Sequence, residues 1–244
     1  LENHGVVCGG ANLLNAFQRM ETLEFTARML ISAHQIGKFR TLNDQQLEKF
    51  RRGADFPDGL QVSSHGIYER ELRKLMVKIV HRACQRKLMC STEGVVSAQV
   101  SEGTFLITPT DLDRFHLGIE DLVLIKNGIG EKGKHPSRAT RLHQKIYQAN
   151  PEIRSIITSQ SPHAMAFAIT SERFDSHTIP ESYIMLRDVP NIDHDTLYDQ
   201  PEEVANIVSQ ATPVLLIEND CVMTTGCNLL EAYDRLEVLE YAIP

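Results

Sequence analysis

Imidazoles, carboxylates and hydroxyls are the side chains of this chain that could do chemistry, and one histidine stands in a repeated context. Leu1–Ala27 and Ile217–Ile243 agree at 12 of 27 positions without a gap, whereas unrelated windows would share roughly one or two. Where the first copy has His4, whose ring nitrogen could bind a metal, the second copy has Asp220. The sequence therefore predicts a tandem duplication whose second unit has been chemically altered.

The repeat divides the chain unequally. We expect residues 1–60 to be the C-terminal end of a first unit and residues 61–244 to be most of a second, with the boundary after the turn-like Phe56–Gly59. The chain begins inside the repeat without a Met, so we interpret it as part of a longer protein. The apolar stripes of Leu13–Ala33 and Leu229–Tyr241 predict equivalent helices in similar surroundings. Separated from its own sheet, Leu1–Lys38 should dock on a neighbouring domain.

Composition excludes several classes of protein. The formal charge is −7 with a pI near 5.8, and no Lys/Arg run could follow a phosphate backbone, which argues against nucleic acid as a partner. No apolar run reaches membrane-spanning length, and no signal-peptide pattern is present. Five cysteines without a CxxC pair indicate free thiols in a reducing compartment. We therefore expect a cytoplasmic protein with no membrane partner.

Periodicity predicts helices flanking one sheet. Helical spacing and short β-like runs alternate without the regular βαβ order of a nucleotide-binding fold, which indicates a three-layer α/β/α domain with a central, mostly antiparallel sheet. The expected helices are Leu13–Ala33, Asn43–Arg52, Tyr68–Arg86, Arg141–Ala149, Glu202–Ser209 and Leu229–Tyr241. The expected strands are Val95–Val100, Thr104–Ile107, Leu122–Lys126, Ile153–Thr158, Tyr183–Leu186, Pro213–Ile217 and Val222–Thr225.

The order and spacing of several segments resemble the class II aldolase/adducin family, which includes zinc-dependent sugar-phosphate aldolases. The resemblance covers residues from about 65 to 244, and Leu1–Leu47 resembles the C-terminal end of the same family. The segments that carry it are Gly94–Ser97, Phe105–Thr110, Glu120–Val123, His135–Ser137, His143–Tyr147, Ile156–Pro162, Asn219–Asp220 and Gly226–Ala232.

This chain differs from the family at the positions that bind zinc and move the proton. Members hold zinc with three imidazoles, two from a His-x-His strand, and the metal stabilises the enediolate formed when a carbon–carbon bond breaks. By resemblance, the His-x-His pair falls on Thr158 and Gln160, and the third imidazole falls on Asp220. The catalytic glutamate, which moves the proton, falls on Ala139. In an intact Asn-His-Gly, His4 would be the third zinc ligand of the first unit.

The substrate-phosphate turns also depart from the family pattern. Asp111 brings a negative charge where the family has a glycine, and Val95 replaces an amide donor. The remaining hydroxyls, a weak phosphate cradle, are Ser97, Thr110 and Ser137.

Three functions stay open at this stage. In the first, this unit is non-catalytic, holds no cofactor and supports an active copy, either in a homo-oligomer or in the first unit. In the second, the protein is a zinc-dependent sugar-phosphate lyase, epimerase or dehydratase, acting through the first unit with His4 or through a relocated metal site of His143, His163 and Asp220. The third, a scaffold role like that of the adducin head, rests on fold analogy alone.

Other polar residues favour ordinary structural roles. His177 and His194 lie among aspartates in what reads as a polar loop, and Arg138 and Arg141 read as solvated charges at a helix start. The basic loop Lys132–His135 reads as solvated too.

Overall fold

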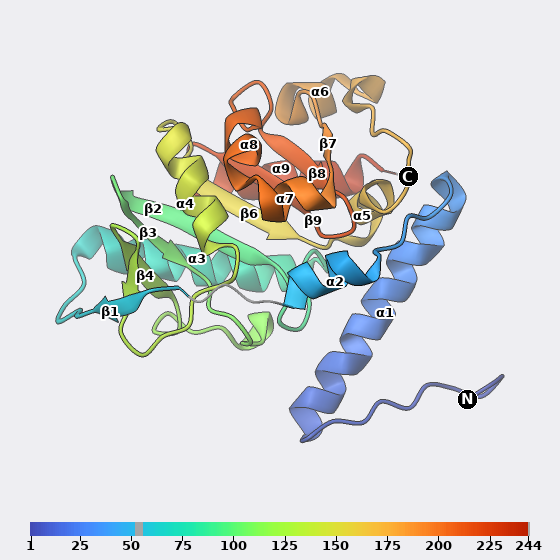
Figure 1. Cartoon of the computed structure of the whole chain (residues 1–244), viewed down its shortest axis with the longest axis horizontal. Helices are drawn as coiled ribbons and strands as arrows, with labels where there is room; N and C mark the ends of the chain where they lie inside the picture. Colours follow the sequence, from blue (N-terminus) through green and yellow to red (C-terminus); the bar gives the residue numbers. More distant parts are fainter. Residues whose placement is uncertain (52–55, 244) are drawn as a thin grey trace.

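A nine-stranded sheet forms the centre of the computed structural model, which describes residues 1–51 and 56–243 (Figure 1). The strand order is β1-β5-β4-β3-β2-β6-β9-β8-β7, and neighbours are antiparallel except in the outer pairs β1–β5 and β7–β8. The strands are β1 (Asp58–Leu60), β2 (Val95–Ser101), β3 (Thr104–Ile107), β4 (Val123–Lys126), β5 (Ile129–Glu131), β6 (Ser155–Ser159), β7 (Asn191–Ile192), β8 (Val214–Ile217) and β9 (Cys221–Gly226).

Helices cover both faces of this sheet. On one face lie α1 (Leu13–Ile36), α3 (Ile67–Gln85), α5 (Pro162–Ala168), α6 (Pro180–Leu186) and α9 (Leu229–Tyr241). On the other lie α4 (Thr140–Ala149), α7 (His194–Asp199) and α8 (Pro201–Ile207). The structure also has two short 3-10 turns, Arg114–His116 and Ser176–Thr178. No helix in the described residues is long and apolar enough to cross a membrane.

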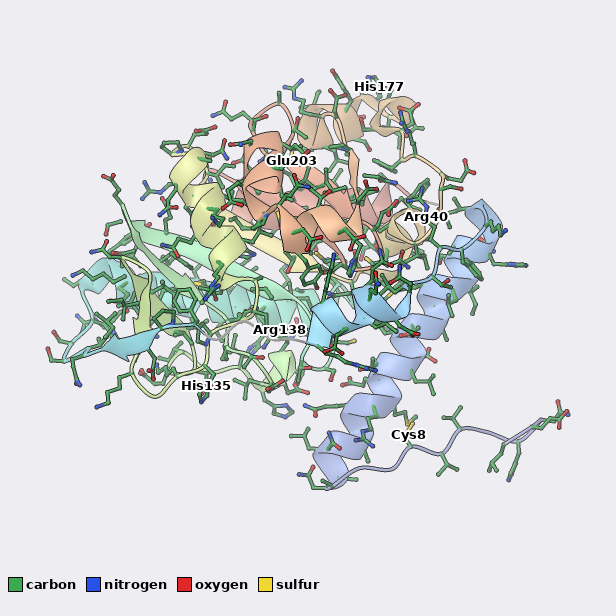
Figure 2. All side chains as sticks on the ribbon, viewed as in Figure 1. Cys8, Arg40, His135, Arg138, His177 and Glu203 are labelled. Atoms are coloured by element: carbon green, nitrogen blue, oxygen red, sulfur yellow. The ribbon has the colours of Figure 1, made fainter. Side chains whose placement is uncertain are left out.

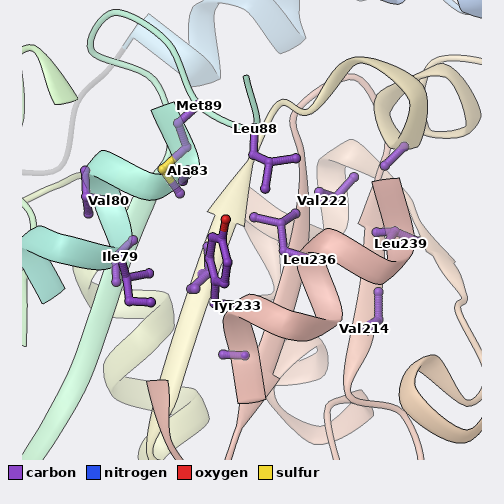
Figure 3. Packing of buried hydrophobic residues seen from close by; sticks show 14 of the residues in the cluster. Ile79, Val80, Ala83, Leu88, Met89, Val214, Val222, Tyr233, Leu236 and Leu239 are labelled. Atoms are coloured by element: carbon purple, nitrogen blue, oxygen red, sulfur yellow. The ribbon is translucent and has the colours of Figure 1, made fainter. Parts of the chain in front are cut away.

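The sheet separates two hydrophobic cores. Because strand side chains alternate between faces, Leu106 and Ile157 pack with α3, α5 and α9, while Ile107 and Ile156 pack with α4 and α8. Figure 3 shows the first core, where Tyr233 of α9 lies among buried side chains of α3 and the strands. The predicted three-layer α/β/α fold with a mostly antiparallel sheet is therefore confirmed.

Some predicted elements differ from those observed. Tyr183–Leu186, expected as a strand, lies in helix α6, which Pro180 begins at a position where its missing N–H costs nothing. Pro162 begins α5, which the sequence did not predict, in the same way. The stretch expected to be least structured contains β1, which pairs with β5 at the sheet edge. A short apolar run does not distinguish strand from helix by periodicity.

The equivalent helices α1 and α9 have different surroundings, so the expectation of similar surroundings is wrong. Helix α1 packs one stripe on α5 and buries only Phe25 and Ala33, and it extends from the body of the domain as a long diagonal rod (Figure 1). In α9, Tyr233, Leu236 and Leu239 are all fully buried.

The chain between α1 and β1 is tied to the rest of the molecule. The backbone N–H of Arg40 donates to the Ile169 carbonyl at 2.8 Å, and the Arg40 carbonyl accepts from the Asn219 side chain at 3.0 Å. Helix α2 (Asp44–Arg51) places Lys49 against Asp195 and Asp199 of α7, at 2.7 and 2.6 Å. These contacts set α2 against α7 and Arg40 against the turn between β8 and β9. The unit boundary after residue 60 stays a prediction.

Candidate functional site

The residues that match the zinc-ligand positions lie at the end of β6 and in the turn between β8 and β9. Thr158 is buried in β6 opposite Met223 of β9. Gln160 follows the strand, and its Nε2 donates to the backbone carbonyl of Asp220 at 3.3 Å. Gln160 and the turn residue Asp220 are therefore in contact.

The Asp220 carboxylate already has a protein partner. The hydroxyl of Tyr198 in α7 donates to its Oδ2 at 2.7 Å, and burial together with this carboxylate raises the pKa of Tyr198 above its ordinary value. The Tyr198 ring lies 4.8 Å from the ring of His194, centroid to centroid. No sequence pattern pointed to Tyr198, because α7 itself was not predicted.

A partly buried carboxyl, Glu93, lies close to Asp220. Burial raises the pKa of Glu93 above its ordinary value, and Asp220 and Asp111 act in the same direction, while Arg138 and Arg114 oppose them. Burial also lowers the pKa of Arg114 to about 10, and its Nε donates to the Gly94 carbonyl at 2.8 Å. The region around Asp220 therefore holds acids and arginines with opposing effects on the pKa of Glu93.

Arg138 is exposed and also contacts α2. Its Nη1 donates to the Phe50 carbonyl at 2.6 Å, and its guanidinium lies over the Phe50 ring at 4.1 Å (Figure 2). A cation over an aromatic face is stabilising at this distance. Arg138 is exposed, as expected for a solvated charge at a helix start, but the sequence did not predict its contact with α2. Phe50 of α2 thus lies against an arginine that acts on Glu93.

Two of the three expected phosphate-binding hydroxyls lie in adjacent turns. The Thr110 N–H donates to the His135 carbonyl at 3.0 Å, and the Ser137 N–H donates to the Thr108 carbonyl at 3.1 Å. Asp111 has a φ of 55°, in the left-handed region that glycine adopts freely. Asp111 therefore has a backbone conformation that suits glycine, the residue that the resemblance places there. Ala139 occupies the N-cap of α4 without a side-chain hydrogen bond.

Ser97, the third expected hydroxyl, lies in a different place. It points to the α4 side of β2, where its Oγ lies 2.7 Å from His143 Nδ1 and 2.6 Å from the Tyr147 hydroxyl. All three side chains are buried. The alternation of β2 explains this placement, because Ser97 is one residue from Val96, which faces the opposite core.

The side chains at the ligand positions do not fit zinc. Zinc prefers imidazole and thiolate ligands in a tetrahedral set, whereas this place offers a hydroxyl, an amide and one carboxylate bonded to Tyr198. Among the described residues, no group of three His, Cys, Asp or Glu side chains is placed to hold a metal ion. His4, the ligand expected for a first unit, is exposed on the N-terminal segment.

The residues of the hypothetical relocated site have separate partners. His143 is bonded to Ser97 in the core beneath α4, whereas His163 is on α5, with its Nδ1 3.3 Å from Glu240. Of the two histidines expected in a polar loop, His177 is exposed and bonded to Asp175, but His194 is 2% exposed. The loop interpretation was therefore wrong for His194, which begins α7.

His143 gives the fold a testable pH dependence. Complete burial lowers the pKa of His143 to about 3. Below pH 6.5 the imidazole is therefore protonated in the unfolded chain but stays neutral in the folded chain until the pH approaches 3. The contribution of neutral His143 to the free energy of unfolding is therefore fully present above pH 6.5. It is lost as pH falls from 6.5 towards 3, at about 1.4 kcal/mol per pH unit.

We expect His143→Asn, which can still accept from Ser97, to show a shallower fall in the free energy of unfolding over this range. Urea denaturation at several pH values measures it. Equal slopes for the two proteins would contradict the assignment of a neutral buried imidazole.

Comparison with known proteins places this geometry in a family. The profile of the Class II Aldolase and Adducin N-terminal domain matches residues 74–243. An L-fuculose phosphate aldolase of Methanococcus vannielii is 30% identical over 172 residues, which are 68% of this chain and 91% of that protein. A 3-oxo-tetronate 4-phosphate decarboxylase of Pectobacterium atrosepticum is 29% identical over 180 residues, covering 70% and 82%.

A solved structure is similar in fold to this chain. The crystal structure of YgbL, a putative aldolase/epimerase/decarboxylase from Klebsiella pneumoniae, superposes with a TM-score of 0.62 at 25% identity, covering 72% of this chain and 88% of that one.

Proposed function

The chain belongs to the class II aldolase and adducin family, and we propose that its 61–244 unit is a non-catalytic member that supports an active copy. The family is zinc-dependent, and its relatives act on small phosphorylated substrates, as the names fuculose phosphate aldolase and oxo-tetronate phosphate decarboxylase state. Under this proposal the domain keeps the family's frame for assembly, while chemistry takes place elsewhere.

The state of Asp220 is the observation that carries this proposal. It stands where the family has its third imidazole, and its carboxylate accepts from Tyr198 while its backbone carbonyl accepts from Gln160. With Oδ2 bonded to Tyr198, a metal at this place would have the second carboxylate oxygen of Asp220 and two weak partners, a hydroxyl and an amide. Without a bound Lewis acid, an enediolate would lack the stabiliser that the family's reaction uses.

The missing base supports the same proposal. At Ala139 a methyl group stands where the family has its glutamate, and so no carboxyl from the start of α4 reaches the site. Glu93 is the nearby alternative acid, but it is partly buried and balanced by arginines. Asp111 adds a negative charge where a substrate phosphate would lie, which opposes phosphate binding.

Zinc content tests the proposal directly. We expect the purified chain, incubated with excess zinc and then desalted, to retain less than about 0.1 zinc per molecule by elemental analysis, because three good ligands are needed for a stable site. The triple variant Thr158→His, Gln160→His, Asp220→His is the matched comparison. About one zinc per unmodified chain, lost on Asp220→Ala, would contradict the proposal.

A further inference from the structure

The N-terminal segment Leu1–Ala27, called here the closing segment, has the local structure of Ile217–Ile243. In the turn, Asn3 and Asn219 have φ values of 53° and 54°. The N–H of His4 donates to the Leu1 carbonyl at 3.2 Å, and the N–H of Asp220 donates to the Ile217 carbonyl at the same distance. Positive φ is uncommon outside glycine, so this shared turn is a specific likeness.

The start of the helix is repeated as well. The side chain of Asn12 accepts from the N–H of Asn15 at 2.8 Å, as that of Asn228 does from Glu231 at 3.0 Å. Arg19 donates to the Gly9 carbonyl at 2.7 Å, and its equivalent Arg235 donates to Thr225 at 2.6 Å.

Glycine is required at the same place in both copies. A Cβ on Gly10 would lie 2.5 Å from the N of Ala16, and one on Gly226 would lie 2.6 Å from the N of Ala232. The closing segment therefore keeps the shape of β9 and α9, although no sheet surrounds it.

What differs between the copies is burial. The strand β9 lies between β6 and β8, whereas the equivalent Gly5–Gly10 is extended and unpaired and stands clear of the domain (Figure 1). The equivalent apolar side chains differ in the same way. Their exposed fractions are 65% for Val6 against 0% for Val222, 86% for Leu13 against 2% for Leu229, 53% for Phe17 against 0% for Tyr233, 57% for Met20 against 0% for Leu236, and 46% for Leu23 against 0% for Leu239.

This exposed face is not the face that α1 uses within the chain. Helix α1 packs on α5 through the stripe that contains Phe25 and Ala33. Leu13, Phe17, Met20 and Leu23 recur at helical spacing on the other side of α1 and are exposed, and exposed apolar side chains gathered on one face mark an interaction site.

One charged residue of the closing segment, Glu21, indicates what kind of surface should cover it. In α9, Glu237 accepts from Arg82 of α3 at 2.8 Å. Its equivalent Glu21 lies beside Asp113 instead, and burial followed by that carboxylate raises the pKa of Glu21 above its ordinary value. A partner with an arginine at the place of Arg82 would form an ion pair with Glu21. The same partner would pair with the unpaired strand and bury the apolar face.

We infer that the closing segment is the last strand and helix of another class II aldolase-like unit, and that the sheet of that unit covers its exposed face. Gly5–Gly10 would enter as the strand equivalent to β9, with the outer face of α1 packed beneath it as α9 packs here. The inference deepens the proposed supporting role, since it names the contact that would hold an active unit to this one. A second copy of this chain does not fit as the occupant, because its own β9 and α9 fill the place.

Hydrogen exchange tests this docking independently of zinc or activity. The amides of Val6–Gly10 are followed in the 244-residue chain and in the protein encoded by the whole reading frame that contains it. We expect exchange at least about a hundredfold slower in the latter, because ladder hydrogen bonds in a central strand protect amides strongly. Equal, fast exchange in both proteins would overturn the inference, as would a reading frame with no aldolase-like unit before Leu1.

Two variants of the protein encoded by the whole reading frame test whether another aldolase-like unit, rather than a different partner, covers the closing segment. Phe17→Glu should restore fast exchange at Val6–Gly10, because its equivalent Tyr233 is fully buried. Ile31→Glu is the control, since Ile31 is also an exposed apolar residue of α1 but lies beyond the repeat. Protection that depends on protein concentration would identify a second copy as the occupant and overturn the inference. The comparison of unmodified proteins stands even if Phe17→Glu fails to fold.

Discussion

Zinc binding should appear when the altered ligand positions are changed together. We expect Thr158→His, Gln160→His and Asp220→His, combined with Ala139→Glu, to raise zinc occupancy from below about 0.1 to about one per chain. The backbone positions needed for such a site are present, because Gln160 already contacts Asp220, and Thr158 lies two residues before Gln160. Elemental analysis and a chelator titration measure the change.

Single reversions are the controls for this variant. One imidazole beside a hydroxyl and a carboxylate makes a weak site, so each single change should bind little zinc. Asp220→His also removes the acceptor for Tyr198, and its stability should be measured in parallel. A single variant that binds zinc as tightly as the combined one would show that the missing ligands do not act as a set.

The repeated helices should respond very differently to the same substitution. Leu236→Ala removes a fully buried side chain of α9 and should lower the free energy of unfolding by about 2–5 kcal/mol. The equivalent Met20→Ala, at a side chain that is 57% exposed, should change it by less than about 0.5 kcal/mol. Tyr233→Ala and Phe17→Ala form a second matched pair. Urea denaturation of the 244-residue chain measures all four.

Equal costs in the two helices would contradict the structure described above. Such a result would mean that the outer face of α1 is buried in solution, and sedimentation would then show an assembly larger than the monomer. In the protein of the whole reading frame, by contrast, Met20→Ala should become costly if the closing segment is docked.

The sequence predicted the fold well where a pattern is long. Leu229–Tyr241 has a full amphipathic period and a capping asparagine, and α9 has those bounds. Short elements were less predictable. Tyr183–Leu186 is too brief for strand and helix to be distinguished by spacing, and α7 carries few apolar residues to mark a period.

The site was predicted only where the family frame fixed it. The meeting of Gln160 and Asp220 follows from the strand and turn that hold them. The roles of Tyr198 and of α2 over Arg138 depend on tertiary contacts between distant segments. Ser97 was misplaced because a turn motif gives the residue type but not the side of the sheet that its side chain faces.

The central claim, that the 61–244 unit keeps the family fold without its active site, is tested most directly by an activity assay. The unmodified chain is supplied with zinc and assayed for retro-aldol cleavage of ketose phosphates, including fuculose phosphate, with and without a chelator. We predict no cleavage above buffer, because losing even one preorganised stabiliser costs about a hundredfold or more in rate, and under our proposal the metal ligands and the base are all replaced. Chelator-sensitive cleavage that co-elutes with the chain and is abolished by Asp220→Ala would contradict the claim.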